Sequence, residues 1–286
     1  MVNVLDAYGH HLRLKDCSDS TVKNYTRLVG TFVRWWEKVA DEPFDLPAVT
    51  PADVADFKRH LLDRGRRPAT VNLCVEALRS FFSWAVAEGL CESNPAGDVR
   101  RVREQNAACR WLSRKEMGSL ARAVQKYGGP RDRAILGLLL HAGLRVSELV
   151  GLKTADIVLR ERSGFVKVWG KGTKYREVPL NITARKMLQE WLAAHPGGEW
   201  LFPGRNGSPV TARAVQIRLK ELGRLARVEV TPHRLRHTFC KMLVDAGESL
   251  DRVAMLAGHA NLNTTARYTR PGVWDLERAV EKLAWE

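Results

Sequence analysis

The sequence predicts a mainly α-helical protein built from two parts, the second of which contains a small antiparallel β-sheet. Three observations support this. Apolar residues recur at helical spacing along most of the chain, for example at Val22, Tyr25, Val29, Phe32 and Trp36. A polar stretch opening with Asn-Pro-Ala-Gly at 94–97 separates two such regions. Strand-like runs occur only at 156–163, 164–169 and 175–180. The predicted boundaries are 1–93, a linker at 94–110, and 111–286.

The first part has the helix-capping and helix-ending residues of a helical bundle. We expect helices at 2–15, from about 20 to 40, at 51–63 and at 69–88, with little strand signal between them. Thr50 followed by Pro51 is an N-cap with proline in the first helical position. Gly89 ends the last of these helices.

The second part opens at a capping box, Ser113 to Glu116. Helices are expected to about residue 125, at 130–141, 182–194 and 211–226, and from 231 onward. The glycines and lysines of 170–174 predict the turn of the last hairpin in the sheet.

The charge is unevenly distributed along the 286 residues, which carry a formal net charge of +14. Residues 1–105 hold 15 basic and 15 acidic side chains, so the whole surplus lies in 106–286. This favours a polyanionic partner, although a solubilising surface gives the same composition. Five cysteines without a Cys-x-x-Cys pair predict a reduced, cytoplasmic protein, and no apolar run is long enough to cross a membrane.

The most informative stretch runs from Thr231 to Tyr268. Thr231 and Pro232 start a helix on which His233 and Arg236 share one face. The N-terminus of a helix favours an anion, because its free N–H groups and its dipole are positive. His259 and Tyr268 follow, and the combination suggests phosphoryl transfer onto a tyrosine.

Two upstream motifs complete the pattern. Ala142-Gly-Leu-Arg145-Val-Ser-Glu148-Leu places an arginine after a predicted helix, and Trp169-Gly-Lys171-Gly-Thr-Lys174 places a lysine in the hairpin turn. The resulting order of Arg, Lys, His, Arg, His and Tyr resembles the tyrosine recombinase (phage integrase) family, in particular its short Xer-like members. The resemblance implies a helical N-terminal DNA-clamping (core-binding) domain and a catalytic domain at 111–286.

The chemistry assigns a role to each of these residues. Tyr268 is the nucleophile, and Arg145 and Arg236 hold the non-bridging phosphate oxygens, since a guanidinium donates two parallel hydrogen bonds and keeps its charge. Lys171 is the general acid for the leaving oxygen. The candidates for additional phosphate donors are His233 and His259, and His233 is also a candidate for accepting the tyrosine proton. His237 is interpreted as a structural, hydrogen-bonded helix residue.

The resemblance adds further expectations. Glu148 supports the active site, Lys171 is preferred over Lys174, and the protein becomes linked to a DNA 3′ end. A tetramer acts on two sites in double-stranded DNA, as a homotetramer or together with a related recombinase. A C-terminal helix at about 273–285 packs on a neighbouring protomer, although packing on its own domain is the alternative. No cofactor is required, because the phosphotyrosine conserves the bond energy.

Several further basic residues are candidates for DNA contact, although a solvated linker or helix face would look the same. They are Arg66, Arg67, Arg100, Arg101, Arg103, Lys174, Arg213 and Arg218.

Two alternatives stay open at this stage, and a third is disfavoured. A type IB topoisomerase-like enzyme would nick and close DNA with the same chemistry. A catalytically silent DNA-binding regulator would use 251–269 as a helix-turn-helix, but it would not explain Arg145 or Lys171. A metal site at His233 and His237 is disfavoured, since Arg234 and Arg236 would repel a dication, and no metal is predicted.

Overall fold

The computed structural model describes residues 2–104, 110–170, 175–258, 265–269, 280, 281 and 283. The chain divides into two compact units, Met1–Ala107 and Ala108–Glu286, and each is described here by itself. The prediction of a mainly helical chain with one small antiparallel sheet is confirmed. In the described part of the chain, no helix is both long enough and apolar enough to span a membrane.

The described residues of the first unit form four helices, α1 (Val2–Leu14), α2 (Asp19–Ala40), α3 (Pro51–Asp63) and α4 (Pro68–Ala87). The N-cap predicted at Thr50 is present, and Asp53 completes a capping box, because Thr50 Oγ1 accepts from Asp53 N and the Thr50 N–H donates to the Asp53 carboxylate. Aromatic rings fill the centre of the unit, with Phe32 and Phe57 meeting edge to face at 5.2 Å.

Residues 94–104 are fastened to α4 by two side chains of that helix. Asn72 is buried, and its amide donates to the Val102 carbonyl and accepts from Val102 N. Arg79 donates to the carbonyls of Ala96 and Val99. This stretch therefore belongs structurally to the first unit as far as residue 104.

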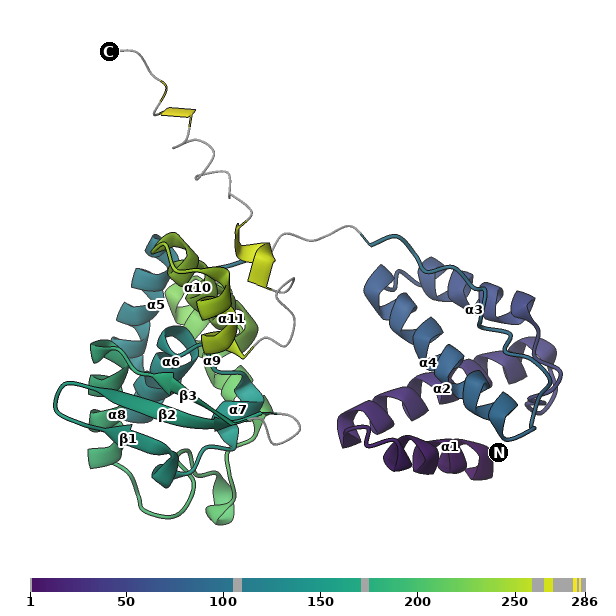
Figure 1. Ribbon diagram of the computed structural model, residues 1–286, viewed down its shortest axis with the longest axis horizontal. Helices are drawn as coiled ribbons and strands as arrows, with labels where there is room; N and C mark the ends of the chain where they lie inside the picture. The colour runs from purple at the N-terminus through teal and green to yellow at the C-terminus, as the bar shows by residue number, and fades with distance from the viewer. Residues whose placement is uncertain are drawn as a thin grey trace. The chain divides into compact units, whose positions relative to one another are not determined.

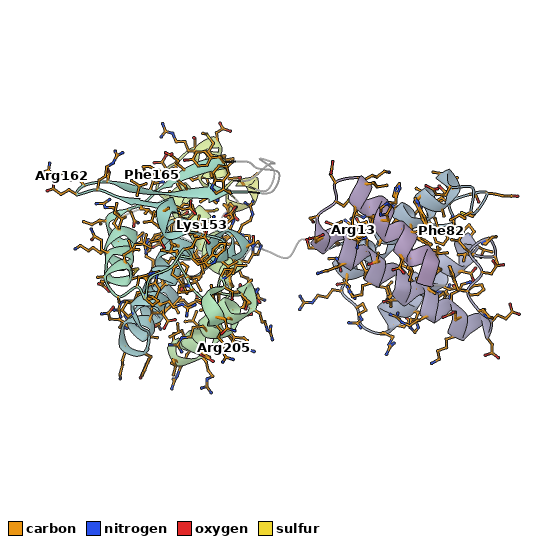
Figure 2. The ribbon with its side chains drawn as sticks, turned by 90° about the horizontal axis from the view of Figure 1, so that it is seen from below. Arg13, Phe82, Lys153, Arg162, Phe165 and Arg205 are labelled. Atoms are coloured by element: carbon orange, nitrogen blue, oxygen red, sulfur yellow. The ribbon has the colours of Figure 1, made fainter. Side chains whose placement is uncertain are left out.

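The second unit begins with α5 (Arg114–Tyr127) and α6 (Pro130–His141), and the short α7 (Val146–Val150) leads into the sheet. The strands are β1 (Ile157–Leu159), β2 (Gly164–Trp169) and β3 (Tyr175–Pro179), paired antiparallel in the order β1-β2-β3. The register sets Trp169 opposite Tyr175, at the two ends of the hairpin turn. At the other end of the sheet, Arg162 points away from the unit (Figure 2).

The remaining helices of this unit are α8 (Ile182–Ala193), α9 (Ala212–Ala226), α10 (Pro232–Asp245) and α11 (Leu250–Ala257). Short 3-10 turns lie at Thr154–Asp156 (η1), Arg205–Gly207 (η2) and Ala266–Thr269 (η3). Helices α10 and α11 lie side by side, and η3 packs against α10 (Figure 1).

Two details differ from the prediction. The first strand was expected over 156–163, but it is limited to Ile157–Leu159 because η1 precedes it and Arg160 N closes a turn onto the Ser163 carbonyl. The helix α7 was not predicted, since five residues are too few to show helical periodicity.

Candidate active site

The helix α10 supplies one wall of the site. Thr231 caps it, with Oγ1 accepting from Arg234 N at 3.1 Å, and Pro232 occupies the first turn as the sequence predicted. Arg236 and His237 follow His233 by three and four positions, and Cys240 follows them by four and three, which places these residues along one face.

Arg236 is a buried cation held by backbone carbonyls. It is only 4% exposed, and it donates to the Gly143 carbonyl at 2.6 Å and to the Ala257 carbonyl. Burial, with the nearby charge of Arg145, lowers the pKa of Arg236 to about 10, so it remains charged at neutral pH. Gly143 has φ +62°, and a Cβ built on it would lie 2.2 Å from the Phe239 ring, so the close approach requires glycine.

Arg145 lies at the N-cap of α7, and Glu148 in the first turn of that helix holds it. The Arg145 backbone N–H donates to Glu148 Oε2 at 2.8 Å, and its Nη1 donates to Oε1 at 2.9 Å. Its Nη2 donates to the carbonyl of Gly258, at the end of α11, at 2.6 Å. Arg145 and Arg236 therefore donate to consecutive carbonyls at the end of α11. The two arginines predicted to bind the phosphate are thus close together.

A third arginine, Arg176 of β3, completes this cluster. It donates from Nη1 and Nη2 to the two oxygens of Glu148 at 2.9 and 3.0 Å. Burial alone would raise the pKa of Glu148, but the hydrogen bonds from Arg176 and Arg145 outweigh it and lower that pKa below its ordinary value. The cluster thus holds one ionised carboxylate among three guanidinium groups.

Tyr268 lies in η3 against α10. Its side chain is 1% exposed, and its Oη lies 2.5 Å from His237 Nδ1. The ring of His237 in turn meets that of His233 edge to face, with 4.0 Å between centroids. Burial raises the pKa of the Cys240 thiol, which also contacts Tyr268 through a hydrogen bond. The phenol therefore has an imidazole nitrogen within proton-transfer distance.

Four of the predicted catalytic residues are described, and they gather on α10, α7 and η3. They are Arg145, His233, Arg236 and Tyr268. Lys171, His259 and the DNA-contact candidate Lys174 lie outside the described residues. Of the predicted C-terminal helix, only 280, 281 and 283 are described, and the side chains of Val280 and Leu283 are exposed.

Sequence reasoning missed Arg176 and the partner of His237. Arg176 shares the inward side of β3 with the buried Val178, so strand alternation was the signal that a charged side chain there needs a partner. His237 was interpreted as a hydrogen-bonded helix residue, but nothing in the sequence indicated that the bond is to Tyr268.

Most of the candidate DNA contacts are exposed, namely Arg66, Arg67, Arg100, Arg101, Arg103 and Arg213. Arg218 differs, because it is engaged by the carboxylates of Asp132 and Glu221 and by the Tyr127 carbonyl. Arg213 lies on a groove of about 910 Å³ that is also lined by Lys220, Arg224 and His233. Glu221 and Glu229 also line this groove, which runs from His233 along α9.

The chain is similar to known proteins over both units. Residues 110–272 match the Phage integrase family, and residues 4–91 match the Phage integrase, N-terminal SAM-like domain. Tyrosine recombinase XerC of Xylella fastidiosa (strain 9a5c) is 35% identical over 257 residues, which is 88% of this chain and 86% of the relative.

Solved structures share the fold. The XerH site-specific recombinase bound to a palindromic difH substrate aligns with a TM-score of 0.78 and 23% identity, over 93% of this chain and 81% of that one. A lambda integrase (75–356) dimer bound to a core site aligns with a TM-score of 0.77 and 20% identity, over 95% of this chain and 97% of that one. The two family matches and the 35% identity to Tyrosine recombinase XerC show that the chain belongs to the phage integrase family and is a Xer-like, tyrosine-type site-specific DNA recombinase.

Proposed function

We propose that this recombinase cleaves and rejoins double-stranded DNA through a covalent 3′-phosphotyrosine formed by Tyr268. The observation that carries the proposal is the hydrogen bond between Tyr268 and His237, one residue along α10 from the buried Arg236. The helix α10 thereby carries the proposed proton acceptor His237 and the fixed cation Arg236, and it contacts the proposed nucleophile Tyr268.

In the proposed cleavage step, Tyr268 Oη attacks the scissile phosphorus and the bond from phosphorus to the 5′ oxygen breaks. The phenolic proton passes to His237, and Lys171 protonates the leaving 5′ oxygen. Arg145 and Arg236 meet the negative charge on the non-bridging oxygens, with His233 and His259 as further donors. Attack by a 5′ hydroxyl on the phosphotyrosine reverses these steps and rejoins the strand.

Tyr268 must move before it can react. A side chain that is 1% exposed does not reach a phosphate on a DNA duplex. We therefore expect η3 to shift on DNA binding, so that Oη leaves its buried position and the phosphate gains access to Arg236, which is itself only 4% exposed.

We further propose that the active assembly is a tetramer on two DNA sites, formed by this chain alone or with a related recombinase. The DNA would be held by the positively charged second unit and by the exposed arginines of the first, so binding should weaken steeply with salt. Neutron or X-ray scattering of the protein with one and two sites would measure the number of protomers.

Covalent trapping tests the chemistry. The protein is mixed in EDTA with DNA from its own genomic neighbourhood, quenched with SDS and digested with protease, and the bound ends are sequenced. We expect adducts on 3′ ends at one locus and none with Tyr268→Phe. Adducts without sequence preference would favour the topoisomerase-like alternative, and adducts that persist with Tyr268→Phe would refute the assignment of Tyr268.

A further inference from the structure

The Glu148 carboxylate is shared equally by two arginines. Its Oε1 accepts from Nη1 of Arg145 and of Arg176, both at 2.9 Å. Its Oε2 accepts from the Arg145 backbone N–H at 2.8 Å and from Arg176 Nη2 at 3.0 Å. Each oxygen therefore has one hydrogen bond from each arginine.

The two arginines differ in their access to a ligand. The side chain of Arg145 is 41% exposed, whereas that of Arg176 is 16% and that of Glu148 is 5%. A Cβ built on Gly258 would lie 2.7 Å from Arg176 Nη1, so the end of α11 covers this guanidinium closely. Arg176 is thus the inner partner of Glu148, and Arg145 is the outer one.

The charges of the cluster do not cancel. Arg145, Arg176 and Arg236 carry three positive charges and Glu148 carries one negative charge, because its lowered pKa keeps it ionised at neutral pH. Of these three arginines, only Arg145 and Arg176 donate from their guanidinium groups to Glu148. Without Arg176, Arg145 would be left as the single guanidinium partner of the carboxylate. The carboxylate would then offset the charge that Arg145 presents to a phosphate.

We propose that Arg176 is the counter-ion of Glu148 and a positioning residue for Arg145, so that the charge of Arg145 stays available to the scissile phosphate. The inference rests on the proposed function, since it assumes that Arg145 meets that phosphate. It gives Glu148 a defined role as well, which is to orient Arg145 without neutralising it.

The test measures single-turnover formation of the covalent adduct on a nicked suicide substrate, with DNA affinity measured separately. Arg176→Gln is expected to lower the cleavage rate roughly ten- to hundredfold while DNA affinity changes little, because affinity depends on many phosphates. Arg176→Lys is expected to recover part of the rate, since it keeps the charge and loses the paired geometry. Arg162→Gln, at the opposite end of the sheet, is the matched control for the loss of one positive charge.

Two further comparisons separate this role from a structural one. The double variant Glu148→Gln/Arg176→Gln is expected to cleave faster than Arg176→Gln alone, because the carboxylate that needs a counter-ion is gone. A methylphosphonate at the scissile position lacks the negative charge, so the difference between wild type and Arg176→Gln should shrink on that substrate. Thermal unfolding of each variant shows whether the protein remains folded.

Three outcomes overturn the assignment of Arg176: an unchanged rate in Arg176→Gln, a double variant no faster than the single one, or an equal defect on the methylphosphonate. If the defect instead disappears on a 5′-bridging phosphorothiolate, whose leaving group needs no proton, Arg176 acts through the general acid and the assignment to Arg145 is wrong. If wild-type protein forms no 3′ adduct, the proposed function fails, and this inference fails with it.

Discussion

Nδ1 of His237 lies 2.5 Å from Oη of Tyr268, and the two residues are 31 positions apart in the chain. The contact joins the one tyrosine of η3 to the middle of α10, between Arg236 and the buried Cys240. It gives the phenol a defined imidazole partner in the folded protein.

We expect His237→Ala and His237→Asn to slow adduct formation by similar factors, on the order of 10²- to 10⁴-fold, as loss of a general base does. Asparagine can keep a hydrogen bond to Tyr268 but cannot accept its proton near neutral pH. Single-turnover cleavage at neutral pH checks this. A fully active asparagine variant would mean that His237 only holds the ring.

The Glu148 carboxylate should stabilise the fold in a pH-dependent way. Its pKa in the folded protein is lowered, so its stabilisation is complete above the ordinary value of 4.5 and is lost as the pH falls through the lowered one. Glu148→Gln is therefore expected to reduce the free energy of unfolding by about 3–5 kcal/mol at pH 7, and by less at pH 3, which is below the ordinary value. Urea denaturation at both pH values measures this, and an equal loss at the two would contradict it.

Gly143→Ala should destabilise the protein through two effects. The residue has φ +62°, and its new Cβ would overlap the Phe239 ring. We expect a loss of about 2–5 kcal/mol in the free energy of unfolding. Gly247→Ala is the matched control, since Gly247 has φ +87° with open space around it, and it should cost about 1–2 kcal/mol. Equal losses in the free energy of unfolding for the two variants would show that the Phe239 ring moves aside without cost.

Asn72→Ala should release residues 94–104 from α4. The buried amide makes hydrogen bonds to both backbone groups of Val102, and their loss should cost about 1–3 kcal/mol. Trypsin then has faster access to the exposed Arg101 and Arg103, which mass spectrometry of the fragments detects. Asn24→Ala is the control, because Asn24 makes an exposed contact with Arg27. Cleavage at the wild-type rate would show that other contacts hold this stretch.

The long helices and the hairpin were predictable because their signals are local. The N-cap at Thr50 and the Ser113–Glu116 capping box lie where they were expected, and periodicity defined the helices that follow them. The helix α7 was not predictable in this way, because five residues complete little more than one turn.

The site was predictable only in part, for a related reason. Arg145, Arg236 and Tyr268 belong to recognisable motifs. The structure places the two arginines at neighbouring carbonyls at the end of α11 and the tyrosine against α10. The contact of Arg176 with Glu148 spans 28 positions, and that of His237 with Tyr268 spans 31, so both depend on how distant segments pack. No local pattern encodes such pairs, and only the folded chain reveals them.

The burial of Arg236 has a consequence for the energetics of turnover. Water has already been removed from this guanidinium, and its donors are oriented by two fixed carbonyls, before any DNA arrives. In the proposed cleavage step, the guanidinium that meets the phosphate must be desolvated and oriented. For Arg236 the free energy of this reorganisation is incurred once, when the chain folds, and not at each strand cleavage.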